Sequence, residues 1–462
     1  MKKNIIIAMM LIIALSVFAA DKAEWTIMVY ISGDNNLDSA LFSDVNEMEM
    51  IGSVHGKLNI IALFDRWSGE WVYGQEGVQK NSKENSGMRI YYIQKDDNTR
   101  ALSSKNITKE MGFEVGMFDA GKPENLEKFI KAVVKKYPAK NYHLDIGTHG
   151  AGVKGVIVDD NAGVQGQNRI MSIPKLKETI GKVFANVVNK IAEKNNENIK
   201  LNVLSFDACL MSMYEVYYEM AKNNIGFSIG SEETIPGVGF SYNKVFGYLK
   251  DKVNRETGIA EDGSNYTKKI VDYYYDDHSG SGEKANLASI KLLSTILDKA
   301  NEQVAKVFEK LNEALEADNS KDIIKEFHKT LYNTSYMTDE DFVDLVDLLR
   351  MIKDNETLAA VVGEEEITKA IMYLKQNVVA HKSMGPSAWA DRVHGYSIYM
   401  PMYFRAERDG VMHSNGALKM KNTLRGFEYI NTDMGRQMAA FQEKYFKIMS
   451  DMTDEEYGNI MN

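Results

Sequence analysis

The stretch LNVLSFDACLMSMYEVYYEM, Leu201 to Met220, places a short apolar run directly before Asp-Ala-Cys and a helix-like pattern directly after it. Its Cys209 is the only cysteine among 462 residues. The apolar residues from Leu210 onward recur at helical spacing, which predicts that Cys209 lies in the first turn of a helix at the end of a strand. Because a helix N-terminus carries about half a positive charge, this position favours a thiolate nucleophile. The alternative is a small apolar side chain buried between helix and sheet.

The first half of the chain alternates β-rich runs with amphipathic segments, which predicts an α/β fold with a largely parallel sheet and helices on both faces. The expected strands are Trp25–Ser32, Leu58–Asp65, Arg89–Gln94, Tyr142–Thr148, Leu201–Phe206 and Gly226–Ser231. The expected helices among them cover residues 37–51, Asn125–Lys136 and Pro174–Asn195.

The second half is rich in Lys and Glu and reads as mostly helical. The expected helices are Tyr266–Asp277, Ala288–Ala317, Asp322–Tyr332, Asp339–Lys353 and Glu366–Val379. A strand at Val393–Met400 interrupts them. We therefore predict an α/β core at 21–255, a helical region at 256–390, a strand at 391–405 that returns to the core sheet, and a helical tail at 406–462.

The N-terminus has the order of a secretory signal peptide, residues 1–20: two lysines, an apolar run and a small-residue site at Ala19-Ala20. The apolar run is shorter than the ~20 residues that a spanning helix needs. We expect a protein that is secreted or periplasmic, with no membrane span in its mature form. Without Lys2 and Lys3, the 55 basic residues fall to 53 against 65 acidic ones. This acidic balance argues against a nucleic-acid partner, whose phosphates require a basic face.

His149 is the best partner for the cysteine among the eight histidines, because it directly follows a β-rich run and precedes a glycine-rich loop in YHLDIGTHGAGVKG. Adjacent parallel strands end at one edge of a sheet, so His149 and Cys209 are expected to meet there. The other candidates are less well placed. His143 begins its strand and is expected at a sheet edge, His394 lies at the entry of its strand, and His278 reads as a solvated loop residue.

Four blocks in order, WTIMVYISGDNNLD, IGTHGAG, SFDACLMSMYEVYYEM and IGSEETIPGVGF, with a weaker fifth, HGYSIYMP, resemble the clostripain-like cysteine peptidases, which share the caspase-like fold. The resemblance implies a caspase-like peptidase core at 21–255 and an additional, mostly helical C-terminal region. The connection from His149 to Cys209 is long for this family, which leaves the number of helices in it open.

The resemblance also implies the roles of the site residues. Cys209 would be the nucleophile, His149 would protonate the leaving amine, and the backbone N–H groups of Gly150 and Cys209 would hold the oxyanion. Substrates would be proteins or peptides with Arg or Lys before the cleaved bond, and Asp207 would floor their pocket. The alternative for Asp207 is a carboxylate that caps the next helix. Glu232 and Glu233 would line the cleft or form a solvated acidic turn.

Relatives are processed between the histidine and the cysteine, and Arg169 is the only arginine in that interval. It lies in a Gly/Asn/Gln-rich stretch that we expect to be exposed and flexible, so self-cleavage after Arg169 is predicted. The alternative is an ordinary loop residue in an enzyme that needs no cleavage.

No cofactor is expected to be required, although some relatives depend on calcium. Asp159 and Asp160 in VDDNAG offer hard oxygen ligands for Ca²⁺, but their spacing matches no EF-hand loop, and a plain acidic turn is the alternative.

Two other functions remain open from the sequence. One is another Cys-dependent acyl transferase or amidase with the same dyad, which hydrolysis of Arg and Lys esters would distinguish. The other is a non-catalytic secreted binding protein with a buried Cys209, which would react slowly with alkylating reagents.

Overall fold

The fold is known from a computed structural model that describes residues 22–67, 86–161, 169–184, 200–255, 263–403 and 422–461. The expected signal peptide, residues 1–20, lies outside the described residues. In the part of the chain that is described, no helix is both long and apolar enough to cross a membrane.

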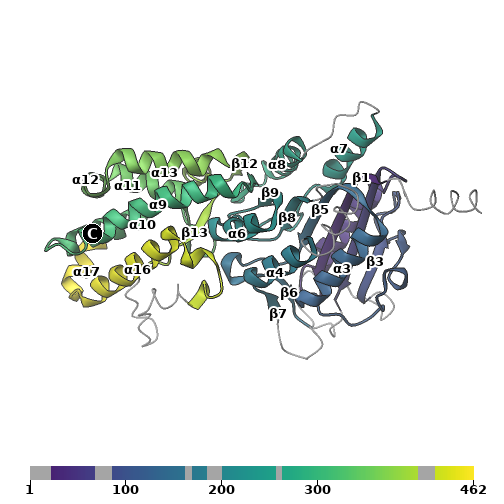
Figure 1. The fold of residues 1–462 in the computed structure, drawn as a ribbon, viewed down its shortest axis with the longest axis horizontal. Helices are drawn as coiled ribbons and strands as arrows, with labels where there is room; N and C mark the ends of the chain where they lie inside the picture. The colour runs from purple at the N-terminus through teal and green to yellow at the C-terminus, as the bar shows by residue number, and fades with distance from the viewer. Residues whose placement is uncertain are drawn as a thin grey trace, which may run out of the picture.

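A central sheet runs through the molecule, and its described strands follow the order β12-β10-β9-β8-β5-β1-β2-β3-β4 (Figure 1). The five inner strands from β9 to β2 pair in parallel, and antiparallel strands flank them on both sides. The bounds are β1 Ala23–Gly33, β2 Leu58–Arg66, β3 Gly87–Tyr92, β4 Lys105–Asn106, β5 Ala139–Gly147, β8 Leu201–Asp207, β9 Ile225–Gly230, β10 Ala285–Lys291 and β12 Val378–Met384. All six strands expected in the first half are confirmed, as is the largely parallel sheet.

Helices cover both faces of this sheet, as predicted. Alternate residues of β1 show why: Ile27 and Val29 pack into one apolar core, whereas Met28 and Tyr30 pack into the other. The first core includes residues of α2 (Asp38–Ile51), α7 (Tyr242–Asn254) and α8 (Ser264–His278). The second includes residues of α3 (Pro123–Lys136), α4 (Ile173–Val183) and α6 (Tyr214–Met220).

Helices dominate the C-terminal region, which forms the left-hand part of Figure 1. Helix α9 packs against α13 and α16. The helices are α9 Ser294–Ala314, α10 Ser320–Tyr332, α11 Leu345–Asp354, α12 Glu356–Val362, α13 Glu364–Gln376, α14 Ser387–Ala390, α16 Asp433–Asp451 and α17 Asp454–Met461. Short elements complete the described chain: β6 Val156–Asp159, β7 Arg169–Met171, β11 Phe342–Asp344, β13 Ser397–Tyr399, and the 3₁₀ turns η1 Lys109–Met111, η2 Gly152–Lys154, η4 Ala221–Asn223 and η5 Tyr429–Asn431.

Residues 256–390, expected to form a helical region, also supply two strands of the central sheet. β10 pairs antiparallel with β9, and β12 pairs antiparallel with β10. Residues 288–291, expected in a helix, lie in β10, and the following helix begins only at Ser294. An unpaired β9 edge would expose a row of N–H and C=O groups, so pairing with β10 stabilises it. The sheet therefore extends well beyond the predicted core boundary at residue 255.

The strand expected to return to the core sheet does not do so. β13 pairs antiparallel with β11 in a separate two-stranded sheet. The edge that β13 would need is occupied, because β10 and then β12 already extend the sheet beyond β9. β13 still reaches the core, since the Ser397 N–H donates to the Ser212 carbonyl at 3.0 Å.

Candidate active site

The pairing of β5 with β8 brings the candidate histidine and cysteine together. These neighbouring strands are parallel, and Gly147 pairs with Asp207 at their carboxyl ends. His149 and Cys209 each follow that pair by two residues. Gly150 lies directly against the cysteine: a Cβ at this position would overlap the Cys209 carbonyl oxygen and lie 3.1 Å from the Cys209 nitrogen. Only glycine therefore allows the loop after His149 to approach the Cys209 backbone this closely.

Cys209 does not lie in the first turn of a helix, which corrects the prediction. Helix α6 begins at Tyr214, and Leu210 has a left-handed φ of 64°. The intervening loop is held by the segment after β9: the Leu210 N–H donates to the Glu233 carbonyl at 3.1 Å, and the Ser212 N–H donates to the Ser231 carbonyl at 2.8 Å. These long-range bonds, absent from any local pattern, keep the helix from starting earlier.

The thiol is therefore not activated by a helix terminus. Its side chain is half-buried, and the Ile235 N–H points at Sγ from 3.4 Å. Burial raises the pKa of Cys209, and the negative charges of Asp207 and Glu233 raise it further. The resting group is thus a thiol, and the thiolate expected from the sequence is not favoured in the free protein.

His149 has a partner that the sequence did not reveal. Its Nε2 lies 2.6 Å from Oδ1 of Asn36, in the loop between β1 and α2. With the amide oxygen facing the ring, Nε2 must carry the hydrogen, which leaves the lone pair on Nδ1. Burial lowers the pKa of His149, and the charge of Asp160 opposes this effect. The imidazole is therefore neutral and held in one tautomer.

The loop that carries Asn36 is itself fixed. The Asn35 side-chain amide donates to the carbonyls of Ser32 (2.9 Å) and Val158 (3.0 Å). Just beyond, Asp38 at the start of α2 accepts two hydrogen bonds from buried Arg66, at 2.6 and 3.0 Å. Asn36 lies in the GDNNLD segment, but no pattern of residue types there distinguishes it from its neighbours. Only the three-dimensional contact identifies it.

Asp207 lies at the carboxyl end of β8 and is only 6% exposed. Its Oδ2 accepts hydrogen bonds from the Phe240 N–H and the Tyr242 hydroxyl, both at 3.0 Å, so it does not cap α6. Gly239, with a φ of +56°, covers the carboxylate; a Cβ there would lie 2.6 Å from Oδ2. Burial raises the pKa of Asp207 to about 6, and the nearby His278 opposes this shift. His278 is a buried residue whose Nε2 bonds to the Gly239 carbonyl at 3.0 Å, not a solvated loop residue.

Glu232 and Glu233 do not line a cleft, and that prediction is wrong. Glu232 is fully buried and accepts hydrogen bonds from the Gly395 N–H (2.6 Å) and the Asn286 side chain (2.8 Å). Glu233, 1% exposed, accepts from the N–H of Thr338 at 3.0 Å. Both carboxylates connect the loop after β9 to the C-terminal region.

His394, the other histidine that precedes a glycine, is held among Asp344 and Arg350. It belongs to the same junction with the C-terminal region.

Asp159 and Asp160 do not fit a calcium site. The two Asp159 oxygens accept the N–H groups of Ala120 (2.9 Å) and Asn161 (3.0 Å), and the charge of Asp160 acts on His149 instead. Across the described ranges, no group of three or more His, Cys, Asp or Glu side chains is arranged to hold a metal ion.

Arg169 is more ordered than the sequence indicated. It begins β7, pairs with Asp159 of β6, and its side chain is 38% exposed. Its Nε lies 2.9 Å from Oδ2 of Asp119. The expectation of a flexible loop at this residue is therefore wrong, because the β6–β7 pairing and this ion pair hold it. The next residue, Ile170, is 42% exposed.

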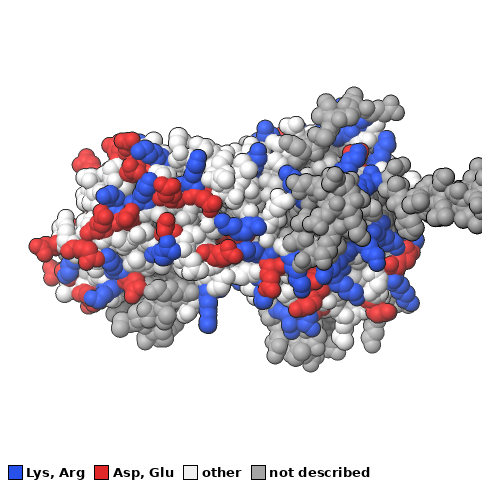
Figure 2. Space-filling model, in the orientation of Figure 1, with Lys and Arg blue, Asp and Glu red and all other residues white. Residues whose placement is uncertain are grey.

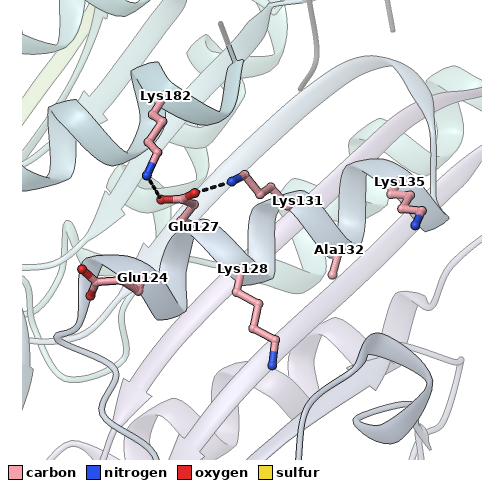
Figure 3. Close-up of a pocket in the computed structure, with 7 residues that line it drawn as sticks. All are labelled: Glu124, Glu127, Lys128, Lys131, Ala132, Lys135 and Lys182. Carbon is pink, nitrogen blue, oxygen red and sulfur yellow. Dashed lines mark hydrogen bonds and ion pairs between the residues drawn. The ribbon is translucent and has the colours of Figure 1, made fainter. Parts of the chain in front are cut away.

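The surface hollows help to locate the chemistry. A hollow of about 500 Å³ on α3 and α4 contains neither a thiol nor a histidine, and its Glu127 pairs with Lys131 and Lys182 (Figure 3). Lys and Arg side chains alternate with Asp and Glu over much of the described surface on this side (Figure 2). A second hollow, of about 510 Å³, lies beside Leu210, next to the cysteine, and is lined by residues 338–341. The second hollow is the one adjacent to the candidate site.

Comparisons with known proteins agree with this arrangement. The model of the Clostripain family matches residues 29–417. Clostripain from Hathewaya histolytica is 26% identical over 419 residues, which cover 81% of this chain and 74% of that protein. Among solved structures, a secreted C11 cysteine protease from Bacteroides thetaiotaomicron in complex with an irreversible peptide inhibitor has a TM-score of 0.58 at 17% identity, covering 89% of this chain and 99% of that one. An inactive zymogen C11 protease from Parabacteroides distasonis has the same TM-score and identity, covering 89% and 98%. The fold is thus the caspase-like fold of C11 proteases.

The raised pKa of the thiol gives a testable pH dependence. Because Cys209 is the sole cysteine, its alkylation by iodoacetamide reports its ionisation directly. We expect the alkylation rate of the folded protein to rise with a midpoint above the ordinary value of about 8.5, since burial disfavours the thiolate. Asp207→Asn removes a negative charge beside the thiol and should lower this midpoint. A fast, pH-independent reaction down to pH 5 would instead indicate a stable thiolate–imidazolium pair.

Proposed function

Because the chain belongs to the clostripain family of cysteine peptidases, we propose that Cys209 and His149 together cleave peptide bonds that follow Arg or Lys. The protein is a cysteine endopeptidase, and its substrates are peptides or proteins. The observation that carries the assignment to these residues is the β5–β8 register, which ends both strands at one place and packs Gly150 against the Cys209 backbone.

The Cys209 thiol carries the proton that is transferred in the reaction, and the His149 imidazole can accept it. The thiol is protonated and the imidazole is neutral, with its lone pair on Nδ1. As Sγ bonds to the carbonyl carbon, the thiol proton passes to Nδ1. Breaking of the C–N bond then transfers that proton to the leaving nitrogen and leaves a thioester on Sγ. Water attacks the thioester, its proton passes through His149, and breaking of the S–C bond restores the thiol.

The oxyanion of the tetrahedral intermediate would be held by the N–H groups of Gly150 and Cys209. These two residues are in contact, so their amides lie close together. In the described part of the chain, neither amide donates to a backbone carbonyl. Donors that are already in place when charge develops stabilise the transition state without any cost of reorganisation.

Asn36 would serve as a positioning residue for the imidazole. Its hydrogen bond to Nε2 fixes both the tautomer and the plane of the ring, and its own loop is anchored to Ser32 and Val158. Its role would be to hold Nδ1 toward the thiol and the leaving amine.

The preference for Arg and Lys would come from Asp207. A buried carboxylate with a hydrogen-bonded oxygen offers a negative charge in a medium of low dielectric constant, where it interacts strongly with a cationic side chain. Gly239 packs closely over this carboxylate, where the Cβ of any larger residue would lie only 2.6 Å from Oδ2.

Export and activation complete the proposal. The signal-like residues 1–20 would direct the protein out of the cytoplasm, as a secreted or periplasmic enzyme. Self-cleavage after Arg169 would separate the rest of β7 from the arginine that pairs with Asp119, and one structural neighbour is described as an inactive zymogen. Neither chemistry nor activation in this scheme requires a cofactor.

The dyad is tested by replacing its members one at a time. We expect Cys209→Ala and His149→Ala to abolish hydrolysis of an Arg-containing peptide, with circular dichroism unchanged. Asn36→Ala should lower kcat about fivefold, the equivalent of one hydrogen bond of about 1 kcal/mol, while KM changes little. Asn98→Ala, in an exposed loop, is the matched control. Wild-type turnover in His149→Ala would contradict the assignment.

The pocket is tested with substrates that differ only in charge. Citrulline has nearly the shape of arginine but no charge. We expect the ratio of kcat/KM for Arg over citrulline substrates to fall by about ten- to a hundredfold in Asp207→Asn, the effect of one hydrogen bond to a charged group. A ratio that does not change in this variant would contradict an Asp207 pocket.

Activation is tested by sequencing the active protein. We expect two associated fragments, the second beginning at Ile170, and a single intact chain in both Cys209→Ala and Arg169→Gln. Asp119→Asn should accelerate cleavage, because it removes the ion pair that holds Arg169. Arg100→Gln, at an exposed arginine outside the interval, is the control. A fully active intact chain would refute activation by cleavage, and a different N-terminus would refute the site.

A further inference from the structure

A continuous chain of buried hydrogen bonds runs beneath the site and ends on Asp207. The Tyr266 hydroxyl lies 3.1 Å from Nδ1 of His143, whose Nε2 lies 2.7 Å from the Ser205 hydroxyl. Ser205 donates to Oδ1 of Asp145, and Oδ2 of Asp145 lies 2.7 Å from the Tyr242 hydroxyl. The same hydroxyl lies 3.0 Å from Oδ2 of Asp207. None of the six side chains is more than marginally exposed: Tyr266, Ser205 and Asp145 are 0%, His143 and Tyr242 2%, and Asp207 6% exposed.

The position of each hydrogen in this hydrogen-bond network follows from the number of donors. Ser205 gives its one hydrogen to Asp145, so Nε2 of His143 must donate to Ser205. The His143 ring is neutral, because burial lowers its pKa to about 3, so Nδ1 accepts from Tyr266. Each of these links therefore donates in the direction of Asp145.

Tyr242 lies between two carboxyl groups but has only one hydrogen to donate. This hydrogen faces both Asp145 and Asp207. If both carboxyl groups were ionised, the Tyr242 hydrogen could bond to only one of them. The oxygen of the other carboxylate would then face the Tyr242 oxygen with no hydrogen between them, which is costly in a buried site. One carboxyl must therefore be a protonated acid that donates to Tyr242, while Tyr242 donates to the other.

We propose that Asp145 is a positioning residue that keeps a proton, donates it to the Tyr242 oxygen, and so holds the hydrogen of Tyr242 and the negative charge of the pair on Asp207. This inference rests on the proposed function, in which Asp207 receives an arginine or lysine side chain. The buried hydrogen-bond network then provides one negative charge, and only one, at the floor of that pocket.

Several observations favour Asp145 over Asp207 as the protonated member. Asp207 also accepts the Phe240 N–H, which stabilises its ionised form. Burial and the charge of Asp207 raise the pKa of Asp145 to about 7, above the value of about 6 for Asp207. All five donor links then point the same way, from Tyr266 toward Asp207, an arrangement in which each bond polarises the next.

The other charged groups around the pair are consistent with a single charge. Asp44 and Glu47 face it from α2, and burial raises the pKa of both carboxyls. His278 faces Asp207 from α8 and lowers its pKa, whereas Cys209 lies on the loop after β8. When only Asp207 is ionised, a cationic substrate side chain neutralises the single charge and no carboxylate is left unpaired. If Asp145 and Asp207 were both ionised, one carboxylate would remain unpaired.

The test compares variants at pH 6.5 with paired Arg and citrulline substrates. Asp145→Asn keeps the shape, and its side-chain NH₂ can donate to Tyr242 as the acid does. We expect it to lower the kcat/KM for Arg less than about fivefold. Tyr242→Phe removes the donor to Asp207. It should lower kcat/KM for Arg about tenfold and move the acid limb of its pH profile upward by about one unit, because Asp207 loses a hydrogen bond to its charged form. The exposed Asp276→Asn is the control for loss of a carboxylate.

Infrared spectroscopy adds a readout that does not depend on turnover. The difference spectrum of the wild type minus Asp145→Asn should contain one carbonyl stretch of a protonated carboxylic acid. A loss in Asp145→Asn as large as in Asp207→Asn, or a carboxylate band in place of the acid band, would overturn the proposal. A normal Arg preference in Asp207→Asn would instead overturn the pocket itself, so the two failures are distinguishable. If Asp145→Asn does not fold, an unmoved acid limb in Tyr242→Phe decides against the proposal.

Discussion

The parallel pairing of β5 with β8 is the constraint on which the rest of the site depends. Its register places Gly147 beside Asp207, so the residues that follow the two strands lie at the same edge of the sheet. Parallel neighbours require a long crossover, and here the crossover brings together residues 60 positions apart in the chain. The histidine, the cysteine and the carboxylate of the proposed pocket all derive their positions from this one ladder.

The same edge concentrates carboxyl groups in a place from which water is largely excluded. Asp145 and Asp207 lie on the paired strands, and Asp44 approaches from α2. Burying several charges together is far more costly than burying one, so protonation and hydrogen bonding must absorb the excess. Tyr242 is the residue that makes the arrangement possible, because one hydroxyl can accept from an acid while it donates to a carboxylate.

The C-terminal region supports the site without supplying its reacting groups. Glu232 and Glu233 extend from the loop after β9 and accept N–H groups from Gly395 and Thr338, which belong to that region. The same loop holds the backbone around Leu210. The geometry of the thiol therefore depends on elements more than a hundred residues away in sequence, and the family match, which extends to residue 417, includes them.

The sequence by itself determined the α/β class, the strands of the first half and the placement of His149 and Cys209 directly after two of them, because the alternation of apolar segments reports which backbone is buried. It did not reveal that α6 begins only at Tyr214, that Glu232 is buried, or that Asn36 contacts the imidazole. Each of these depends on hydrogen bonds between segments that are distant in the chain, and such bonds leave no periodic pattern. The burial of a segment is encoded in its own residues. The hydrogen-bond partner, orientation and protonation state of each side chain are decided only when the tertiary structure brings the groups together.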